Sequence, residues 1–359
     1  MSRTQPAVRT TTRRPSLGWP PRRRPRAHRR RERTAARGPW KRGPVFTACA
    51  LLLGLLLLLH GALPDWAGLG SLVETFLPWF GLPVPVLLAG ALWRRSAASG
   101  VALLLPVTVW LYLFGGLLGD GTHRGGDLTV VSHNVAAENR DPAGTARELA
   151  ASGADVLALE ELTDRSTGTY ETELATAYPH HTVQGTVGLW SRLPLSDTRP
   201  VDVLWDTAGP SAGKPRPGGA PVEPPRGLRT TVATAKGPVA VYVVHLGSVR
   251  VMPRGGYWTE QRDTGATKLA AAVAAERAER LVVLGDFNGT LDDRAFDGLT
   301  AQLRSVQEVA GDGFGFSWPA SFPVARIDQV LVRGVDPKSA WLLPATGSDH
   351  RPVAAAVGW

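Results

Sequence analysis

The sequence predicts an α/β domain that follows three apolar helices. Three observations support this fold class: an Arg-rich N-terminus, three long apolar stretches before residue 120, and short strand patterns alternating with helix patterns from residue 128 onward. Strand patterns outnumber helix patterns, which favours an α/β sandwich over a regular βαβ sheet. At 359 residues the chain has room for a domain of roughly 230 residues with its own core.

Charge is divided unevenly along the chain. Residues 1–42 hold fifteen Arg or Lys and one acid, so they carry +14; because the whole chain carries +9, residues 43–359 carry −5. A basic total usually indicates a nucleic-acid partner, but here the part that can fold is acidic. We predict that residues 1–42 are a disordered, basic, cytoplasmic tail, because they contain too few aliphatic residues to form a core. The single cysteine, Cys49, excludes a disulfide framework and a Cys-based zinc site.

Residues 43–120 are predicted to form three transmembrane helices. The apolar stretches are Val45 to Leu63, Ser71 to Trp93 and Ala97 to Leu118, and each is long enough to cross about 30 Å of hydrocarbon. The first has a longer apolar core than a signal peptide and is expected to be retained as an anchor. The second contains Glu74 and three prolines, which membrane helices tolerate, so we expect three spans rather than two.

Basic residues beside these stretches predict the orientation in the membrane. The Arg-rich tail and Arg94-Arg95 mark the cytoplasmic side, whereas residues 64–70 contain no basic residue. Three crossings then place everything after Asp120 outside the cytoplasm. We therefore predict a multi-pass cell-membrane protein with a cytoplasmic N-terminus, a linker at residues 121–127 and an extracytoplasmic domain at residues 128–359.

The domain is predicted to contain three helices and nine strands. The helices are expected at Ala143 to Ala151, capped by Asp141, at Glu171 to Ala177 and at Asp263 to Glu279. The strands are expected at Leu128 to Asn134, Val156 to Glu160, Gly188 to Ser191, Thr230 to Ala235, Val239 to Leu246, Leu281 to Leu284, Ile327 to Val332, Trp341 to Leu343 and Val353 to Val357. Residues 206–227, rich in Pro and Gly, are predicted to be a long surface loop.

One predicted strand is followed by polar residues of the kind found in binding and catalytic sites. The apolar run Leu281 to Leu284 is followed by Gly285-Asp286-Phe287-Asn288, which places a carboxylate and a carboxamide two residues apart at the rim of a sheet. Such groups suit a hard cation and a phosphate. Taken alone, the motif fits an ordinary turn equally well.

Polar residues recur at the ends of the other predicted strands. They are Asn134, Glu160, Glu161, His245, Asp328, Asp349 and His350. Singly, each has a structural explanation as a cap, a turn or a satisfied buried group. Jointly, they supply what phosphoester hydrolysis needs: oxygen ligands for Mg²⁺ or Mn²⁺, an acceptor to orient water, and donors for the charge that develops on the phosphoryl oxygens.

These motifs resemble those of the endonuclease/exonuclease/phosphatase superfamily, which has the DNase I-like fold. The resemblance runs in order over residues 128–357. It rests on Ser132-His133-Asn134-Val135, Asp155 to Glu161, Leu189 to Leu195, Val244-His245-Leu246, Gly285 to Asn288, Arg326-Ile327-Asp328 and Ser348-Asp349-His350. It implies a four-layered α/β sandwich with two central sheets and a divalent metal, Mg²⁺ or Mn²⁺, in the cleft at their edge.

The resemblance implies three metal ligands. Asn134 and Glu161 would hold the metal, with Asp349 as a further ligand. Glu161 is preferred to Glu160 because the family usually shows Gln-Glu at this place, and this chain has Glu in the Gln position.

The resemblance also implies the catalytic and substrate-binding residues. Asp286 would orient or deprotonate the attacking water, and Asn288 and His245 would bind the phosphate. His350, paired with Asp328, would donate to the developing charge, because a neighbouring carboxylate favours the imidazolium form.

Three functions fit this resemblance. The first is a membrane-anchored, metal-dependent phosphoesterase acting outside the cytoplasm on a phosphorylated lipid or cell-envelope substrate, the second an extracytoplasmic nuclease, and the third a non-enzymatic membrane protein that kept the fold. We expect the first: Ala136 replaces an acid of the DNA-repairing members, and residues 127–359 hold only 22 basic against 27 acidic residues. Nucleic acid remains the alternative partner because Arg250, Arg254 and Arg262 follow His245. The architecture also resembles the VanJ group of actinobacterial membrane proteins, linked to teicoplanin resistance.

Overall fold

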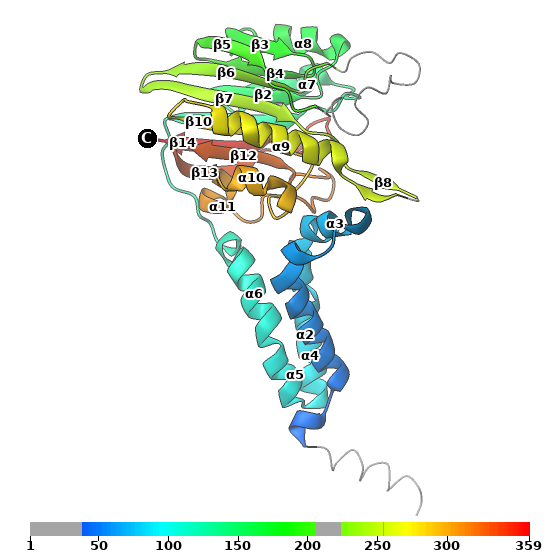
Figure 1. The fold of residues 1–359 in the computed structure, drawn as a ribbon. Helices are drawn as coiled ribbons and strands as arrows, with labels where there is room; N and C mark the ends of the chain where they lie inside the picture. The colour runs from blue at the N-terminus through cyan, green and yellow to red at the C-terminus, as the bar shows by residue number, and fades with distance from the viewer. Residues whose placement is uncertain (1–37, 205–223, 254) are drawn as a thin grey trace, which may run out of the picture.

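The computed structural model describes residues 38–204, 224–253 and 255–359. These residues form a bundle of apolar helices that leads into an α/β domain (Figure 1). Residues 1–37 of the predicted tail, residues 206–223 of the predicted loop, and Arg254 lie outside the described residues. Gly227, the last residue of the predicted loop, begins a strand.

Two six-stranded sheets form the centre of the domain. The first contains, in spatial order, β13 (Asp336–Leu342), β14 (Val353–Gly358), β1 (Leu128–Asn134), β2 (Val156–Glu160), β4 (Val187–Ser191) and β3 (His180–Gln184). The second contains β11 (Arg304–Ser305), β12 (Asp328–Arg333), β10 (Leu281–Asp286), β7 (Gly237–His245), β6 (Gly227–Thr234) and β5 (Leu195–Pro200). A separate hairpin joins β8 (Arg250–Met252) to β9 (Gly256–Trp258). Both sheets are mixed, because β1 and β2 run parallel, as do β7 and β10, whereas their other pairs are antiparallel.

Three apolar layers separate four layers of backbone. The inner faces of the two sheets share one core, which includes Val130 and Val241. The outer face of the first sheet packs on α7 (Pro142–Ala151) and α8 (Asp164–Leu174), and that of the second on α9 (Glu260–Ala275) and α10 (Asp297–Thr300) (Figure 1). Two further short helices of the domain are η6 (Arg294–Phe296) and α11 (Val306–Ala310). The apolar runs of β2 and β10 are buried throughout, as expected for strands covered on both faces.

All nine predicted strands form, with ends that differ by up to five residues, and two of the three helices lie earlier than predicted. The helix expected at Glu171 to Ala177 begins at Asp164, because Thr163 and Ser166 form a capping box ahead of it. The helix expected at Asp263 to Glu279 ends at Ala275, where the Glu276 carboxylate accepts the Ala278 N–H at 2.9 Å and turns the chain. The helix after Asp141 forms as predicted, with the Asp141 carboxylate accepting the Gly144 N–H at 2.8 Å.

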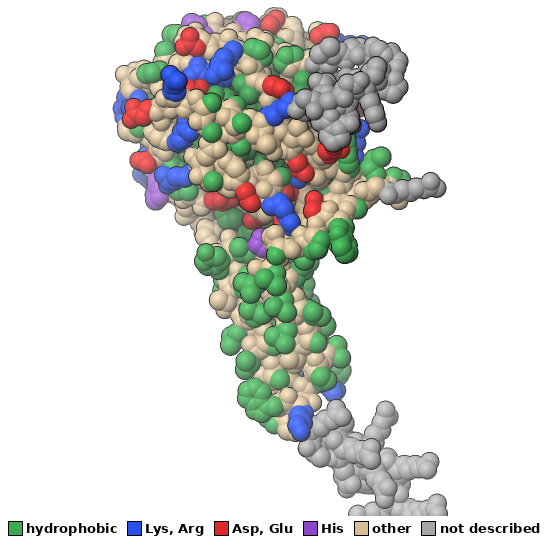
Figure 2. Space-filling view, in the orientation of Figure 1, with side chains coloured by type: hydrophobic (Ala, Val, Ile, Leu, Met, Phe, Trp, Pro, Cys, Tyr) green, Lys and Arg blue, Asp and Glu red, His purple; other side chains and the backbone are tan. Residues whose placement is uncertain are grey.

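Within the described part of the chain, three apolar helical segments are long enough to cross a membrane: Pro44–Ala62, Leu77–Arg94 and Ala97–Leu118. They contain α2 (Pro44–Leu59) with η2 (His60–Ala62), then η4 (Leu77–Gly81) with α4 (Pro83–Arg94), then α5 (Ala97–Ala102), α6 (Leu104–Phe114) and η5 (Gly115–Leu118). Hydrophobic side chains cover the bundle, and basic side chains lie at its end far from the domain (Figure 2). Ser99 Oγ donates to the Gly43 carbonyl at 3.2 Å, so the first segment begins beside the turn between the second and third.

The second candidate span begins later than predicted. Residues 71–75 belong to a separate short helix, α3 (Leu69–Thr75), which follows η3 (Trp66–Gly68) and packs on the domain. Glu74 is fully buried, and its Oε1 lies 2.6 Å from Arg294 Nη2. Since a buried carboxylate is stable only with a partner, this ion pair keeps α3 on the domain instead of extending the span.

The same arginine also holds the end of the first span. Arg294 donates to the carbonyls of Leu63 at 2.7 Å and His60 at 3.1 Å, and its pKa is raised above its ordinary value by the Glu74 carboxylate. Beside it, Ser71 Oγ donates to Asp293, whose carboxylate also pairs with the fully buried Arg262 at 2.8 Å. The helical bundle is therefore attached to the domain by buried charges as well as by the chain.

We predict that Arg294→Ala lowers the free energy of unfolding by about 3 kcal/mol, because it leaves the Glu74 carboxylate buried without its cation. Thermal unfolding of the full chain in detergent measures this loss. Arg304→Ala is the matched control, since Arg304 is largely exposed and lies 4.0 Å from Asp336. Equal losses in the two variants would contradict the stabilising role of the buried pair.

Candidate active site

Strand register gathers the predicted site residues at one edge of the two sheets. Asn134 ends β1 beside Glu160 of β2, and His245 ends β7 beside Asp286 of β10. Each of these pairs of strands is parallel, so the carboxyl ends of both strands meet at the same edge. Asp328 begins β12 directly opposite Asp286.

Asn134 joins the two sheets at this edge. Its Nδ2 donates to Asp286 Oδ2 at 2.9 Å and to Glu161 Oε1 at 3.0 Å, while its Oδ1 accepts the Ala136 N–H at 3.0 Å. The amide thus bridges two carboxylates as a donor. To act as the predicted metal ligand through Oδ1, it would have to turn over and release the Ala136 N–H.

The backbone is strained where it presents these side chains. Three non-glycine residues, Ala136, Glu161 and Asn288, have left-handed φ values of 58°, 61° and 50°. Such conformations cost on the order of 1–3 kcal/mol each and cluster at functional sites. Gly285 has a φ of 145°, and a Cβ there would lie 1.9 Å from the Val244 carbonyl oxygen, so only glycine lets β10 and β7 approach this closely.

His350 and Asp328 form a buried charged pair. His350 Nδ1 lies 2.9 Å from Asp328 Oδ2, and His350 Nε2 lies 3.9 Å from Asp286 Oδ2. Burial by itself would lower the pKa of His350, but Asp328 and Asp286 outweigh it and raise this pKa to about 10. The imidazolium therefore persists at neutral pH, with Asp328 holding one ring nitrogen and the other free to donate.

Asp286 is a buried carboxyl that titrates near neutral pH. Burial raises its pKa most, Asp328 adds to the rise, and His350 with hydrogen bonds from Asn134 and Asn288 opposes it, which leaves the pKa at about 7. The backbone N–H of Asn288 donates to Asp286 Oδ1 at 2.8 Å. Such a group can accept a proton from water at physiological pH.

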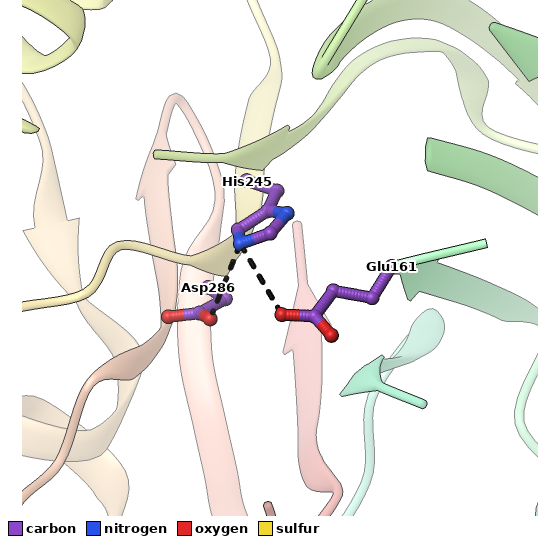
Figure 3. Close-up of side chains that lie close together, drawn as sticks. All are labelled: Glu161, His245 and Asp286. Atoms are coloured by element: carbon purple, nitrogen blue, oxygen red, sulfur yellow. Dashed lines mark ion pairs between the residues drawn. The ribbon is translucent and has the colours of Figure 1, made fainter. Parts of the chain in front are cut away.

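His245 has no hydrogen-bond partner for either ring nitrogen within the described part of the chain, although it is only 3% exposed. Its Nε2 faces Glu161 Oε1 at 3.7 Å and Asp286 Oδ2 at 3.8 Å (Figure 3). Burial, together with the charge of Arg226, lowers the pKa of His245 to about 4, so the ring is neutral. A buried ring without partners, beside two carboxylates, indicates a place for a ligand.

Glu161, His245 and Asp286 fit a divalent metal. One ligand atom from each lies within 4.8 Å of the other two. The two carboxylates favour a hard cation such as Mg²⁺ or Mn²⁺. Asp286, Asp328 and His350 meet the same spacing, but His350 is a cation already bonded to Asp328 and suits a metal poorly. The structure thus places the predicted ligand Glu161 beside His245, which was predicted to bind the phosphate, and Asp286, which was predicted to act on the attacking water.

Asp349 does not join either group. Its side chain is exposed, and its Oδ2 accepts the Trp318 Nε1–H at 3.2 Å. The neighbouring His350 is buried, because the two consecutive residues point in opposite directions ahead of β14. The predicted third ligand is therefore not placed at the cluster that fits a metal.

The consecutive residues Glu160 and Glu161 differ in burial and in the direction of their pKa shifts. Glu160 is fully buried, its Oε1 accepts the Ser132 hydroxyl at 3.0 Å, and burial raises its pKa well above the ordinary value. Burial also opposes the charge of Glu161, but hydrogen bonds from Asn134 and the Ala137 N–H outweigh it and lower the pKa. The lowered pKa favours the ionised form of Glu161, which supports its choice as the ligand, whereas burial disfavours the charged form of Glu160.

Sequence analysis missed the residues that hold this arrangement. Ser348 Oγ donates to the Asn134 carbonyl at 2.7 Å and accepts the His350 N–H at 3.1 Å. Ser317 Oγ accepts the Asp328 N–H at 3.3 Å. Ser348 stands inside a motif that the sequence shows, whereas no sequence pattern marks Ser317.

The fold and the paired carboxylate and histidine groups define a metal-dependent hydrolase of phosphoester bonds. The family model described as the Endonuclease/Exonuclease/phosphatase family matches residues 131–350. The chain therefore belongs to the endonuclease/exonuclease/phosphatase family, as its motifs predicted.

Solved structures confirm the fold. A functionally unknown conserved protein from Enterococcus faecalis is 13% identical, with a TM-score of 0.50 over 64% of this chain and 99% of that one. TDP2 from D. rerio, complexed with a single-strand DNA product, is 18% identical, with a TM-score of 0.50 over 65% and 99%. Beta toxin from Staphylococcus aureus is 14% identical, with a TM-score of 0.50 over 64% and 99%. No curated protein matched the chain.

We predict that Asp328→Asn shifts the alkaline limb of the rate profile to lower pH. The change removes a carboxylate that raises the pKa of His350 and leaves the opposing effect of burial, so the imidazolium loses its proton at lower pH. The pH dependence of kcat/KM measures the shift. Asp349→Asn is the control, because the exposed Asp349 contributes less to the same pKa, and an equal shift in both variants would contradict the pairing.

Proposed function

We propose that this protein is a membrane-anchored, metal-dependent phosphoesterase that hydrolyses a phosphate ester or diphosphate of a lipid or cell-envelope substrate outside the cytoplasm. The main observation behind the proposal is that the partly buried Arg294 of the catalytic domain pairs with the buried Glu74 and so attaches the domain to the three apolar segments. A catalytic domain fixed against membrane-spanning helices acts on substrates at the membrane surface.

The position of charge supports the orientation. Among the described basic residues, Arg94 ends the second segment, Arg95 follows it, and residues 41–42 precede the first segment, at the end of the bundle opposite the domain. Cytoplasmic flanks carry an excess of Lys and Arg, so the domain lies on the other side. The acidic balance of residues 127–359 favours a substrate with few phosphates over a nucleic acid.

In the proposed reaction, Asp286 orients the attacking water and, as a carboxylate, accepts its proton. The water oxygen bonds to phosphorus while the P–O bond to the leaving group breaks, and the leaving oxygen takes a proton from solvent. His350, held by Asp328, donates from Nε2 to a phosphoryl oxygen as negative charge develops there. His245 and Asn288 lie at the same edge and would bind the phosphate, Asn288 after releasing the bonds from its Nδ2 to the Leu246 carbonyl at 3.1 Å and to Asp286 Oδ2 at 3.2 Å. Glu161 and Asp286, with His245 beside them, would hold a divalent metal, which would supply positive charge to the phosphoryl group.

A nuclease of the same fold is the second candidate. The D. rerio TDP2 structure contains a single-strand DNA product. In this chain, the Arg250 guanidinium lies 5.7 Å from the ring centre of Trp258 on the β8–β9 hairpin, and such cation and aromatic pairs bind single strands.

Substrate preference tests the proposal. The purified full chain is assayed with Mg²⁺ or Mn²⁺ against a long-chain lipid monophosphate, a lipid diphosphate, a soluble phosphodiester and single-stranded DNA. We predict that a lipid phosphate is cleaved at least tenfold faster than DNA, that chelation abolishes turnover, and that Asp286→Asn lowers it by on the order of 10² to 10⁴. Faster cleavage of DNA would favour the nuclease, and turnover that survives exhaustive chelation would exclude metal dependence.

A further inference from the structure

An apolar cavity of about 440 Å³ lies where the second and third helical segments meet the catalytic domain. Its walls include Trp79 of η4, Val107, Trp110 and Leu111 of α6, and Phe314 and Phe316 from the loop between α11 and β12. The volume is in the range of small-molecule sites. Membrane helices and catalytic domain thus build one cavity together.

The described residues that line the cavity present almost no polar surface to a ligand. None of its lining side chains is charged, and both indole N–H groups are already used: Trp79 Nε1 donates to the Val324 carbonyl and Trp110 Nε1 to the Pro78 carbonyl, each at 2.8 Å. A polar ligand would lose its hydrogen bonds to water without replacement, whereas a hydrocarbon chain would lose none. The chemistry of the walls therefore selects a hydrocarbon.

The domain wall of the cavity is continuous with the catalytic pair. Phe316 stacks on Trp79, with ring centres 5.5 Å apart, and on Phe314, with centres 5.2 Å apart. The next residue is Ser317, whose Oγ accepts the Asp328 N–H and whose carbonyl accepts the Arg351 N–H at 2.9 Å. The same loop therefore lines the cavity on one side and supports Asp328 and the segment that carries His350 on the other.

We propose that this cavity holds the hydrocarbon chain of the phosphorylated substrate while its phosphate lies at Asp286 and His350. The inference rests on the proposed function and names its substrate class as a long-chain lipid phosphate. The η4 and α6 walls belong to candidate membrane spans, so a chain enters from the bilayer without crossing water. Covering each methylene is worth roughly a factor of four in affinity, so chain length governs turnover.

A variant that fills the cavity tests this inference. Val107→Trp places an indole in the cavity, and Thr108→Trp adds the same side chain to the same helix at an exposed position outside it. We expect Val107→Trp to lower kcat/KM for a long-chain alkyl phosphate at least tenfold more than for a short-chain one, and Thr108→Trp to leave that ratio unchanged. An unchanged ratio in folded Val107→Trp, or an equal change in both variants, would overturn the inference.

Photolabelling of the unaltered chain keeps the inference testable without turnover. A long-chain alkyl phosphate with a diazirine in its chain should label Phe314 or Phe316, and the matching alcohol should label them less. Equal labelling by the alcohol would show that an ordinary bilayer lipid occupies the cavity, and it would overturn the inference. If neither long nor short phosphates are hydrolysed with Mg²⁺ or Mn²⁺, the proposed function fails, whereas the labelling result still decides what the cavity holds.

Discussion

The hydrogen bond from Asn134 Nδ2 to Asp286 Oδ2 joins the two sheets at the point where the candidate site forms. Each sheet alone would present only part of the polar residues. Asn134 ends β1 and Glu161 follows β2 in the first sheet, whereas Asp286 ends β10 in the second. Hydrogen bonds to a charged group contribute about 1.5–3 kcal/mol, and a buried carboxylate that loses one is destabilised further. The strained φ values of Glu161 and Asn288 persist because this hydrogen bond and the neighbouring ones hold both residues in place.

A second set of buried charges fixes the site relative to the helical bundle. Arg294 lies six residues after Asn288 and pairs with Glu74. This ion pair therefore joins the chain that follows the site residue Asn288 to α3, the helix that follows the first candidate span. The predicted linker is also paired with the domain, since the Gly121 N–H donates to the Gly311 carbonyl at 2.9 Å. These two contacts restrict the movement of the domain relative to the helical bundle more than a flexible linker alone would. The apolar cavity between α6 and Phe316 depends on this fixed geometry.

Local patterns in the sequence predicted the central strands and most of the site, because buried parallel strands are apolar runs and their polar ends must meet at one edge. The edge strands β3 and β5 escaped prediction, since they are polar and partly exposed. Glu74 was placed in a span because its partner Arg294 is 220 residues away, and no local pattern reports such a pairing. Asp349 was predicted to bind metal from its motif, but which of two consecutive side chains turns inward depends on the packing of the loop around Trp318.

The central claim is that an ionised Glu161 beside His245 and Asp286 holds the metal on which phosphoester hydrolysis depends. The most direct measurement is Mn²⁺ affinity of the full chain, determined by titration, compared with Glu161→Gln and Glu160→Gln. The account predicts at least a tenfold loss of affinity in Glu161→Gln and little change in Glu160→Gln, because Glu160 is buried against Ser132 outside the metal group and burial raises its pKa, whereas the pKa of Glu161 is lowered. Equal losses in the two variants, or a larger loss in Glu160→Gln, would contradict the proposed metal site.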